Sequence, residues 1–357
     1  MPEPVTVIVP TYNECRNLPV LVERLRAALT KEGRAFECLV VDDDSPDGTA
    51  EVGRGLGPDV RTLVRVGERG LATAVIWGLR HAKHELCVVM DADLSHDPAM
   101  VPSLAAAVEG GAPFALGSRY AEGGRMVDWS LLRWVNSIGA TVMARPLTRA
   151  ADPMSGFFCC RRDAVPLDQL NPTGFKIALE ILVKAGISQP VEVPITFTDR
   201  LHGSSKLDFA EQVAYVTHLI RLYKWRWPLL TEFVLFCIVG TVGLVFDLAI
   251  ITALVESGVW FGWARIAGFA AAVSSNFVLN DRFTFEGAGK VPLGQRYARF
   301  VLTSSAGLAI NYVTSMLLYG NVAIAREYYW LAAIGGVLAG TLVNFAGARM
   351  YAFRKTE

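Results

Sequence analysis

The chain has 357 residues, enough for two domains, and its 34 basic and 34 acidic residues leave no formal net charge at pH 7. This balance gives no support to nucleic-acid binding, since the domains that bind nucleic acids typically carry an excess of basic residues. The charges are unevenly distributed, because about 52 of them precede Trp227, and the mean hydropathy of +0.34 is high for a soluble protein. We therefore expect a globular α/β part followed by a membrane part.

The N-terminal residues MPEPVTVIVP contain no basic stretch followed by a cleavable apolar segment, so we expect no signal peptide. The six cysteines show no Cys-x-x-Cys or zinc-site spacing, which indicates reduced thiols in a cytosolic compartment. The five histidines form no ligand pattern, and we assign none of them to a metal.

In the first part, short apolar runs alternate with amphipathic stretches. The apolar runs predict buried strands over Val5–Val9, Glu37–Val41, Val60–Val66, Leu86–Met90 and Phe114–Leu116. The amphipathic stretches predict helices over Leu18–Leu29, Ala72–His81 and Pro98–Val108. This alternation predicts a mostly parallel sheet, and ligands of such sheets bind at the carboxyl ends of the strands.

Polar loops follow the first two predicted strands. The first loop is Pro10-Thr11-Tyr12-Asn13-Glu14, and the second is Asp42-Asp43-Asp44-Ser45-Pro46-Asp47-Gly48. Three consecutive acids are costly unless they face cations or hydrogen-bond donors. An ordinary Asp-Pro/Asp-Gly turn is the alternative, but both loops fall at the same sheet edge, so we interpret the turn as also functional.

The fourth predicted strand runs into Asp91-Ala92-Asp93. Residues i and i+2 of a strand share a face, so both carboxylates should leave the strand end in the same direction. Two such oxygen ligands suit Mg²⁺ or Mn²⁺ carrying a diphosphate, whereas a chance Asp-x-Asp in a solvated turn is the alternative. Arg69-Gly70-Leu71-Ala72 opens a predicted helix, where free amides and a cation could meet a phosphate. No dinucleotide-binding or P-loop glycine motif is present.

A series of cations follows the fifth predicted strand. It comprises Arg119, Arg133 at the start of a further helix, Lys176, and Arg200 and Lys206 in the loop Asp199–Leu207. Each could be a solvated surface charge. As a set beside the acidic loops, they complement a diphosphate leaving group and a phosphate acceptor.

Seven motifs in the first 210 or so residues carry a family resemblance. They are Pro10–Glu14, Val41–Thr49, Met90–His96, Gly117–Tyr120, Asp152–Phe158, Gly174–Lys176 and His202–Leu207. With these motifs in this order, the chain resembles glycosyltransferase family 2, which has the GT-A fold, and within it the polyprenol-phosphate (dolichol-phosphate) mannose synthases.

The resemblance implies roles for individual residues. Pro10, Tyr12, Glu14, Asp43 and Ala92 would bind the nucleotide sugar together with the two aspartates. Asp91 and Asp93 would hold the metal and the diphosphate. The catalytic cations would be Arg119, Arg133, Arg200 and Lys206, and the acceptor phosphate would contact Arg119, Arg133, Ser205 and Lys206.

One position departs from the family pattern. Some relatives have Gln where Ser95 stands, and there the side chain also ligates the metal. Ser95 could supply a weaker oxygen ligand or leave its place to water.

The last 130 or so residues contain four stretches that are nearly free of charge. They cover about residues 233–256, 262–280, 300–319 and 330–348, and each could cross the membrane as a helix. The alternative is two buried hairpins of a soluble domain. Cations cluster before the first stretch and after the second and fourth, so both termini and the globular part should be cytoplasmic.

A weak internal repeat supports two similar helical hairpins. Asn276-Phe277…Phe283-Thr284-Phe285 recurs as Asn344-Phe345…Tyr351-Ala352-Phe353. This half resembles the GtrA-like membrane family. For Asp247 and Asn276, polar residues inside apolar stretches, we favour hydrogen bonding between helices over a transport site.

Between the halves, Phe209, Val213, Val216, Ile220, Tyr223 and Trp227 follow a helical spacing. This stripe predicts a helix at the membrane surface, with a core-facing helix as the alternative. The expected architecture is a GT-A α/β catalytic domain (1–207), an amphipathic linker helix (208–228) and a four-helix transmembrane domain (229–357).

The resemblance implies an enzyme of the membrane that transfers mannose from GDP-mannose to dolichyl or polyprenyl monophosphate with inversion, using Mg²⁺ or Mn²⁺. A transferase using UDP-glucose or another donor is the nearest alternative. A processive polysaccharide synthase is less favoured, because Arg221-Leu222-Tyr223-Lys224-Trp225 only loosely matches Gln-x-x-Arg-Trp. A different possibility is a membrane half that flips the lipid carrier.

Overall fold

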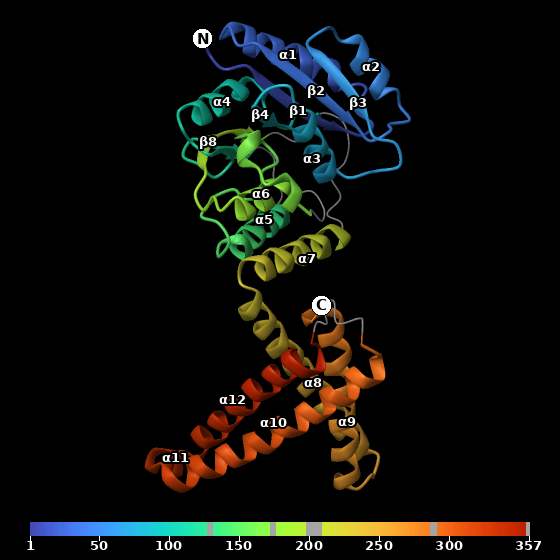
Figure 1. Cartoon of the computed structure of the whole chain (residues 1–357), viewed down its shortest axis with the longest axis vertical. Coiled ribbons are helices and arrows are strands. Elements are labelled where there is room, and N and C mark those ends of the chain that lie inside the picture. The colour runs from blue at the N-terminus through green and yellow to red at the C-terminus, as the bar shows by residue number, and fades with distance from the viewer. Residues whose placement is uncertain (127–130, 172–175, 198–208, 286–290, 355–357) are drawn as a thin grey trace. The chain divides into compact units, whose positions relative to one another are not determined.

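The computed structural model describes residues 1–126, 131–171, 176–197, 209–285 and 291–354, without the side chains of 131–133 and 209 (Figure 1). It divides into two compact units, Met1–Arg226 and Trp227–Glu357. Each unit has its own apolar core, as expected for two domains.

The first unit is built on a sheet with strand order β3-β2-β1-β4-β7-β5-β8. The strands are β1 (Val5–Thr11), β2 (Phe36–Asp42), β3 (Val60–Val64), β4 (Leu86–Val89), β5 (Phe114–Ser118), β7 (Phe158–Arg161) and β8 (Val191–Pro194). All neighbours pair in parallel except β7, which runs antiparallel between β4 and β5. A small second sheet joins β6 (Arg125–Met126) to β9 (Thr196–Phe197). The five predicted strands are confirmed as β1 to β5, whereas β6, β7, β8 and β9 were not predicted.

Helices cover both faces of the sheet (Figure 1). They are α1 (Leu18–Lys31), α2 (Thr49–Gly55), α3 (Leu71–His81), α4 (Val101–Glu109), α5 (Leu131–Ala144), α6 (Ile177–Lys184) and α7 (Phe209–Arg226). Alternate residues of β1 serve the two faces: Val7 belongs to the core under α1 and α4, and Ile8 to the core under α3 and α6. Burial on both faces explains why the strands are continuous apolar runs.

Helix α7 packs on α5 and α6 through its own apolar face. Leu219 and Leu222 are buried there with Ala144 and Leu179. The Tyr215 hydroxyl donates to the Ala140 carbonyl at 2.7 Å. A helix was predicted here, at the membrane surface, with a core-facing helix as the alternative. The helix is present and one of its faces is buried on the first unit, whereas its place at the membrane surface stays a prediction.

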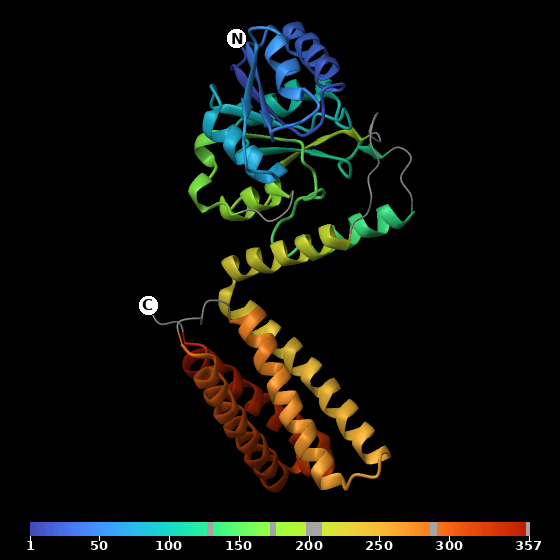
Figure 2. The ribbon, with the colours of Figure 1, turned by 90° about the vertical axis from the view of Figure 1, so that its right-hand side faces the viewer.

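The second unit consists of two helical hairpins, α8 with α9 and α10 with α12 (Figure 2). Its helices are α8 (Pro228–Glu256), α9 (Phe261–Leu279), α10 (Leu293–Asn321), α11 (Ala323–Glu327) and α12 (Tyr329–Gly347). Among the described residues, three helical segments are long and apolar enough to span a membrane: Pro228–Glu256, Leu293–Asn321 and Tyr329–Ala352. The predicted count of four is not confirmed, because α9, although as long as α12 at 19 residues, contains the polar residues Arg265 and Asn276.

The sequence repeat has a physical basis in this unit. Each hairpin ends in a π-helical turn, η4 (Asn280–Thr284) or η5 (Ala348–Ala352). The aromatic residues that follow these turns meet, because the Phe285 and Phe353 rings stack at 4.9 Å with an interplanar angle of 15°. The repeated aromatic residues therefore build one shared core between the hairpins.

The predicted hydrogen bond between helices is found for Asp247 but not for Asn276, whose buried Oδ1 has no hydrogen-bond partner among the described residues. Arg265 Nη1 on α9 donates to Asp247 Oδ2 on α8 at 2.8 Å. Asn276 and Asn344 lie against Gly243 and Gly307, where an added Cβ atom would clash with their side-chain oxygens. Arg265, the partner of Asp247, was not identified from the sequence.

Candidate active site

The described loops of the first unit that contain predicted site residues lie at one edge of the sheet. They follow the carboxyl ends of β1, β2, β4 and β5, and the loop that precedes β7 joins them because β7 is antiparallel. The register places Phe158, where β7 begins, beside both Val89 and Leu116. The edge where parallel strands end is thus the candidate site, as the sequence predicted.

The loops after β1 and β2 are joined by backbone donors. The amides of Asn13, Glu14 and Cys15 donate to Ser45 Oγ (3.0 Å), Thr49 Oγ1 (2.9 Å) and Asp47 Oδ2 (3.2 Å). Asn13 and Asp44 have positive φ values of 61° and 56°. Residues other than glycine adopt this left-handed conformation mainly in tight turns. The two loops form one rigid rim.

The three consecutive acids have different environments. Asp42 is fully buried and accepts hydrogen bonds from Thr11 Oγ1 (2.9 Å) and Ser45 Oγ (2.6 Å), so it holds the rim together. Asp43, also buried, is bound by Arg65 Nε at 2.8 Å and by the Gly70 amide at 2.8 Å. Asp44 is exposed. The two buried acids, Asp42 and Asp43, therefore meet hydrogen-bond donors, whereas Asp44 faces solvent. Arg65 was not predicted as a partner of Asp43.

Two further predicted nucleotide contacts lie on this rim. Tyr12 is 43% exposed, and the Arg69 guanidinium lies over its ring at 4.7 Å from the centroid. Glu14 Oε2 accepts a hydrogen bond from Asn17 Nδ2 at 2.7 Å. Pro10 is buried as part of β1. An exposed aromatic face with a cation above it can contact a nucleotide base or its phosphates.

Asp91 and Asp93 lie in a turn after β4, because the strand ends at Val89. The strand argument for their common direction was therefore wrong. Asp93 is buried and accepts a hydrogen bond from the Ser95 amide at 3.0 Å, whereas the side chain of Asp91 is 31% exposed. Gly156, in the loop before β7, adjoins Asp91: an added Cβ would lie 3.6 Å from Oδ2.

Ser95 and His96 complete this turn. Ser95 Oγ is buried and has no hydrogen-bond partner among the described residues. His96 stacks on Phe157 at 5.1 Å and meets the edge of Phe197 at 5.5 Å, with Nδ1 3.9 Å from Asp91 Oδ2. Burial lowers the pKa of His96, against the opposing effect of Asp91 and Asp93, so the imidazole is neutral at pH 7.

These residues fit a divalent ion that also binds a substrate diphosphate. Within the described ranges, no cluster of three or more His, Cys, Asp or Glu side chains could hold an ion alone. Asp91 and Asp93 could supply two hard oxygen ligands, and Ser95 Oγ, which has no hydrogen-bond partner among the described residues, could add a third oxygen from the same turn. Mg²⁺ is commonly bound by one or two carboxylates plus substrate phosphates, which matches this set.

Arg119 follows β5 and forms an ion pair with Asp152. Its Nε and Nη2 each lie 2.7 Å from a carboxylate oxygen of Asp152, and its backbone amide donates to the same carboxylate at 3.1 Å. The guanidinium also lies 5.5 Å from the centre of the Phe197 ring. Asp152, carried by the loop before β7, was not assigned a role from its motif.

Lys176, just before α6, belongs to the same buried group. Its Nζ donates to the Met154 carbonyl at 3.0 Å. Burial and the nearby charge of Arg119 lower the pKa of Lys176 to about 8, while Asp152 and Asp91 oppose the shift. Lys176 was among the cations predicted from the sequence, but its interaction with Asp91 was not predicted.

Ala92, between the two aspartates of the turn, is buried. The other predicted site residues lie outside the part of the chain that the structure describes. The residues Arg200, Ser205 and Lys206 fall in 198–208, and the side chain of Arg133 is likewise not described. Their roles stay predictions.

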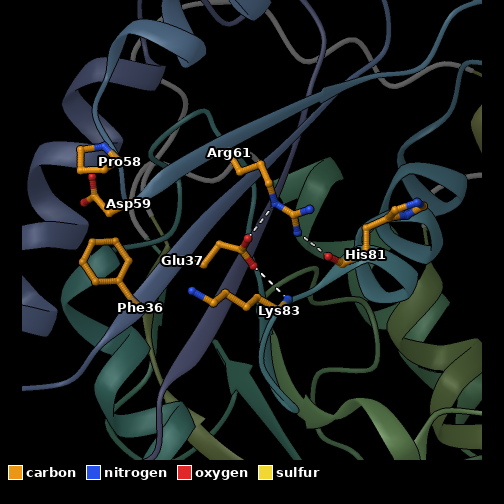
Figure 3. A pocket seen from close by; sticks show the side chains of 7 residues that line it. All are labelled: Phe36, Glu37, Pro58, Asp59, Arg61, His81 and Lys83. Atoms are coloured by element: carbon orange, nitrogen blue, oxygen red, sulfur yellow. Dashed lines mark hydrogen bonds and ion pairs between the residues drawn. The ribbon is translucent and has the colours of Figure 1, made fainter.

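A separate pocket of about 470 Å³ lies at the opposite edge of the sheet, where β2 and β3 begin (Figure 3). Its charged groups bind one another: Glu37 accepts from Arg61 Nε at 2.8 Å and from the Lys83 amide at 3.0 Å. This pocket contains none of the predicted site residues.

Both halves of the chain match models of known protein families. Residues 6–166 match the glycosyl transferase family 2 model, and residues 235–353 match the GtrA/DPMS transmembrane domain model. A dolichol-phosphate mannosyltransferase from Pyrococcus furiosus is 38% identical over 347 residues, covering 96% of this chain and 97% of the relative.

Two fungal relatives and one solved structure extend the comparison. The dolichol-phosphate mannosyltransferases of Mycosarcoma maydis and Saccharomyces cerevisiae are 41% and 43% identical, covering 70% and 62% of this chain and 85% and 87% of the relatives. Glucosyl-3-phosphoglycerate synthase from Mycobacterium tuberculosis, 18% identical, superposes with a TM-score of 0.48 over 61% of this chain and 79% of that chain. The chain belongs to glycosyltransferase family 2, within the dolichol-phosphate mannosyltransferase group that carries a GtrA-type membrane domain.

Proposed function

We propose that this protein transfers mannose from GDP-mannose to a dolichyl or polyprenyl monophosphate, with inversion, at the cytoplasmic face of the membrane. The similarity along nearly the whole chain to the Pyrococcus furiosus dolichol-phosphate mannosyltransferase carries the proposal. Three features support it: the acidic turn with Asp91 and Asp93, the cations Arg119 and Lys176, and the apolar helices that could hold the protein in a membrane.

The acceptor needs no protein base. A phosphate monoester has a second pKa of about 6, so it is largely dianionic at pH 7 and already nucleophilic. One of its oxygens attacks the anomeric carbon from the face opposite the diphosphate, and the bond from that carbon to the diphosphate oxygen breaks.

The protein must then hold two anions close together, the acceptor phosphate and the diphosphate of the donor. Asp91 and Asp93 would hold Mg²⁺ or Mn²⁺, with Ser95 as an additional oxygen, and the bound ion supplies Lewis-acid stabilisation of the leaving diphosphate. Lys176 would add a positive charge beside Asp91, and Arg119 would be kept in a fixed orientation by Asp152.

The rim formed by the loops after β1 and β2 would bind the donor. Tyr12 and Glu14 offer an exposed ring and a carboxylate, and Pro10 and Ala92 would shape the pocket. Asp43 would act largely by ordering Arg65 and the start of α3, since both of its oxygens have protein donors.

The acceptor would be bound by cations outside the donor rim. The proposed contacts are Arg119, Arg133, Arg200, Ser205 and Lys206. The chain from 198–208 leads directly into α7, and α7 ends one residue before the first apolar membrane helix begins. This order favours delivery of a membrane-borne phosphate to the site.

We further propose domain limits of 1–207, 208–228 and 229–357, with both termini in the cytoplasm and α9 as a fourth span. Val213 and Val216 of α7 are about half exposed, which supports a membrane-surface role for its second face. Cations concentrated around Arg282, Arg296 and Arg349 support the orientation.

The experiment is a donor competition. The full chain in detergent is given polyprenyl phosphate and an equimolar mixture of GDP-mannose, UDP-glucose and UDP-galactose, and the lipid products are identified by mass spectrometry. We expect hexosyl lipid that carries isotope only when the mannose is labelled. Label from UDP-glucose would favour the alternative donor, and the absence of any hexosyl lipid would favour a membrane half that only moves a carrier.

A further inference from the structure

The second unit contains an ion pair inside its apolar helices that the proposed transfer reaction does not use. Arg265 Nη1 on α9 lies 2.8 Å from Asp247 Oδ2 on α8. The side chain of Asp247 is 12% exposed, whereas that of Arg265 is 58% exposed. Ionisable residues inside apolar membrane helices are costly, and where they occur they usually serve binding or transport. The pair is therefore a candidate site within this unit.

The internal repeat shows that a hairpin of this kind does not need the ion pair. Asp247 lies against a glycine of α9 in the first hairpin, and Asn311 lies against a glycine of α12 at the matching place in the second. Arg265 stands eleven residues before the repeated asparagine of its hairpin, and Ala333 stands at that place in the other. The second hairpin thus has uncharged residues at both positions. Helix packing alone therefore does not explain why Arg265 is present.

Arg265 lies towards the end of the unit at which both hairpins turn. The shared aromatic core joins the starts of α8 and α10 to the ends of α9 and α12, so the turns are at the opposite end (Figure 2). Exposed aromatic side chains mark the turns of both hairpins: Trp260, Phe261, Trp263, Tyr328, Tyr329 and Trp330. Trp and Tyr are enriched where a membrane meets water. Arg265 is the fifth residue of α9, about 6 Å along the helix from its start, so its long side chain can reach the lipid headgroups.

Asp247 binds one arm of the guanidinium and leaves one edge available. Nη1 donates to the carboxylate, and no further hydrogen bond of the Arg265 side chain is found within the described residues. The edge formed by Nε and Nη2 matches the spacing of two phosphate oxygens. Asp247 is held between the helices, with its Oδ1 buried, so the carboxylate fixes the orientation of an otherwise exposed cation. This arrangement is suited to a phosphate that approaches from the lipid.

We propose that Arg265 binds the phosphate group of a membrane lipid through its Nε and Nη2 edge, and that Asp247 orients the guanidinium. Phospholipids and polyprenyl phosphates share this chemistry, and the two sources are separated by experiment below. The site lies within the second unit. Its occupancy does not depend on the sugar that the first unit transfers.

Lipid retention by the full chain in detergent tests the proposal. The protein is incubated with dioleoylphosphatidylglycerol or with dioleoylglycerol, which has the same acyl chains but no phosphate, and retained lipid is measured by native mass spectrometry. Polyprenyl phosphate and polyprenol form a second pair. Because the active site also binds a phosphate, the measured quantity is the retention that Arg265→Gln removes. We expect this quantity to be larger for the phosphorylated lipid, and the pair that shows it identifies the source. No difference in either pair would overturn the proposal.

Substitutions locate the site. Arg265→Gln should weaken retention of the phosphorylated lipid about tenfold, because a charge-assisted hydrogen bond is lost. Arg265→Lys keeps the charge without the two-donor edge and should weaken it less. The matched control is Arg326→Gln, since Arg326 lies at the same end of the unit and its guanidinium binds the carbonyl oxygens of Tyr319 and Gly320. This control should have little effect, and an equal loss would reduce the effect to general surface charge and overturn the site.

A double variant separates lipid binding from folding. Arg265→Gln alone leaves the carboxylate of Asp247 without its ion-pair partner and should lower the thermal unfolding temperature. Combined with Asp247→Asn, it gives the first hairpin uncharged residues at both positions, as in the second hairpin, and the unfolding temperature should return towards that of the wild type. We expect the double variant to remain deficient in lipid retention. Retention at the wild-type level in this variant would show that Arg265 only neutralises Asp247, and the proposal would be wrong.

Discussion

Arg119 and Asp152 form a two-pronged ion pair in the candidate active site, with two N···O distances of 2.7 Å and a fully buried carboxylate. The pair joins the end of β5 to the loop before β7, the same loop that brings Gly156 beside Asp91. It therefore fixes the geometry of the acidic turn as well as that of the cation.

Removing one member of this pair should be costly. Asp152→Ala leaves a buried guanidinium without its partner, so we expect a loss of about 3–5 kcal/mol in the free energy of unfolding of the first unit. Chemical denaturation of the full chain, followed by fluorescence, measures it. The control is Asp168→Ala, which breaks the exposed pair with Arg80 and should cost less than about 1 kcal/mol. Similar losses in the two variants would contradict the structural role of Asp152.

Lys176 predicts an alkaline limit to activity. Its pKa of about 8 lies below the ordinary value of 10.5, so the ammonium loses its charge as the pH rises through 8. Because the unfolded chain keeps this proton up to about pH 10.5, the residue's effect on stability runs the other way, and stability rises with pH between the two values. We expect kcat to fall above pH 8, and Lys176→Arg to move this fall to higher pH. A fall at the same pH in both proteins would exclude Lys176 as its source.

The glycine–asparagine contacts in the membrane unit can be tested with a matched pair of variants. Gly243→Ala places a Cβ atom against the Asn276 side chain and should destabilise the first hairpin by about 1–3 kcal/mol. Gly240→Ala lies on the same helix with open space around it and should change stability by less than about 0.5 kcal/mol. Thermal unfolding in detergent measures both. Adding Asn276→Ala to the first variant should recover part of the loss, and no recovery would show that another contact is responsible.

The acceptor assignment predicts a separation of kinetic effects. Arg200→Ala and Lys206→Ala should raise KM for polyprenyl phosphate roughly tenfold, as expected when a charge-assisted hydrogen bond is lost, with a smaller change in KM for GDP-mannose. Steady-state kinetics with each substrate varied in turn measures both constants. Equal changes in the two KM values would count against this assignment.

Much of the catalytic fold could be predicted, because β1, β2, β3 and β4 are apolar runs whose ends are marked by polar loops. The position of β7 could not be predicted in this way. Its residues Phe158–Arg161 are a short run without a periodic pattern, and the partners that make it an antiparallel strand lie 42–75 residues earlier in the chain.

For the candidate site, the sequence predicted which loops lie at the sheet edge but not which side chains bind one another. Motif order and sheet topology brought Tyr12, Asp43 and Asp91 to one edge. Pairs such as Asp43 with Arg65, or Asp247 with Arg265, depend on side chains 18–22 positions apart, and no local pattern marks an isolated arginine as a partner. Asp91 and Asp93 are unequally buried in a turn, because the strand ends at Val89, one residue earlier than predicted.

The most direct test of the central claim is the rate of mannosyl-lipid formation from radiolabelled GDP-mannose as a function of added Mn²⁺, for the wild type and for Asp91→Ala and Asp93→Ala. We predict that EDTA abolishes transfer by the wild type, that Mn²⁺ or Mg²⁺ restores it, and that both variants stay inactive at every concentration although they insert and fold. Near-normal turnover in EDTA, or in either variant, would contradict the account.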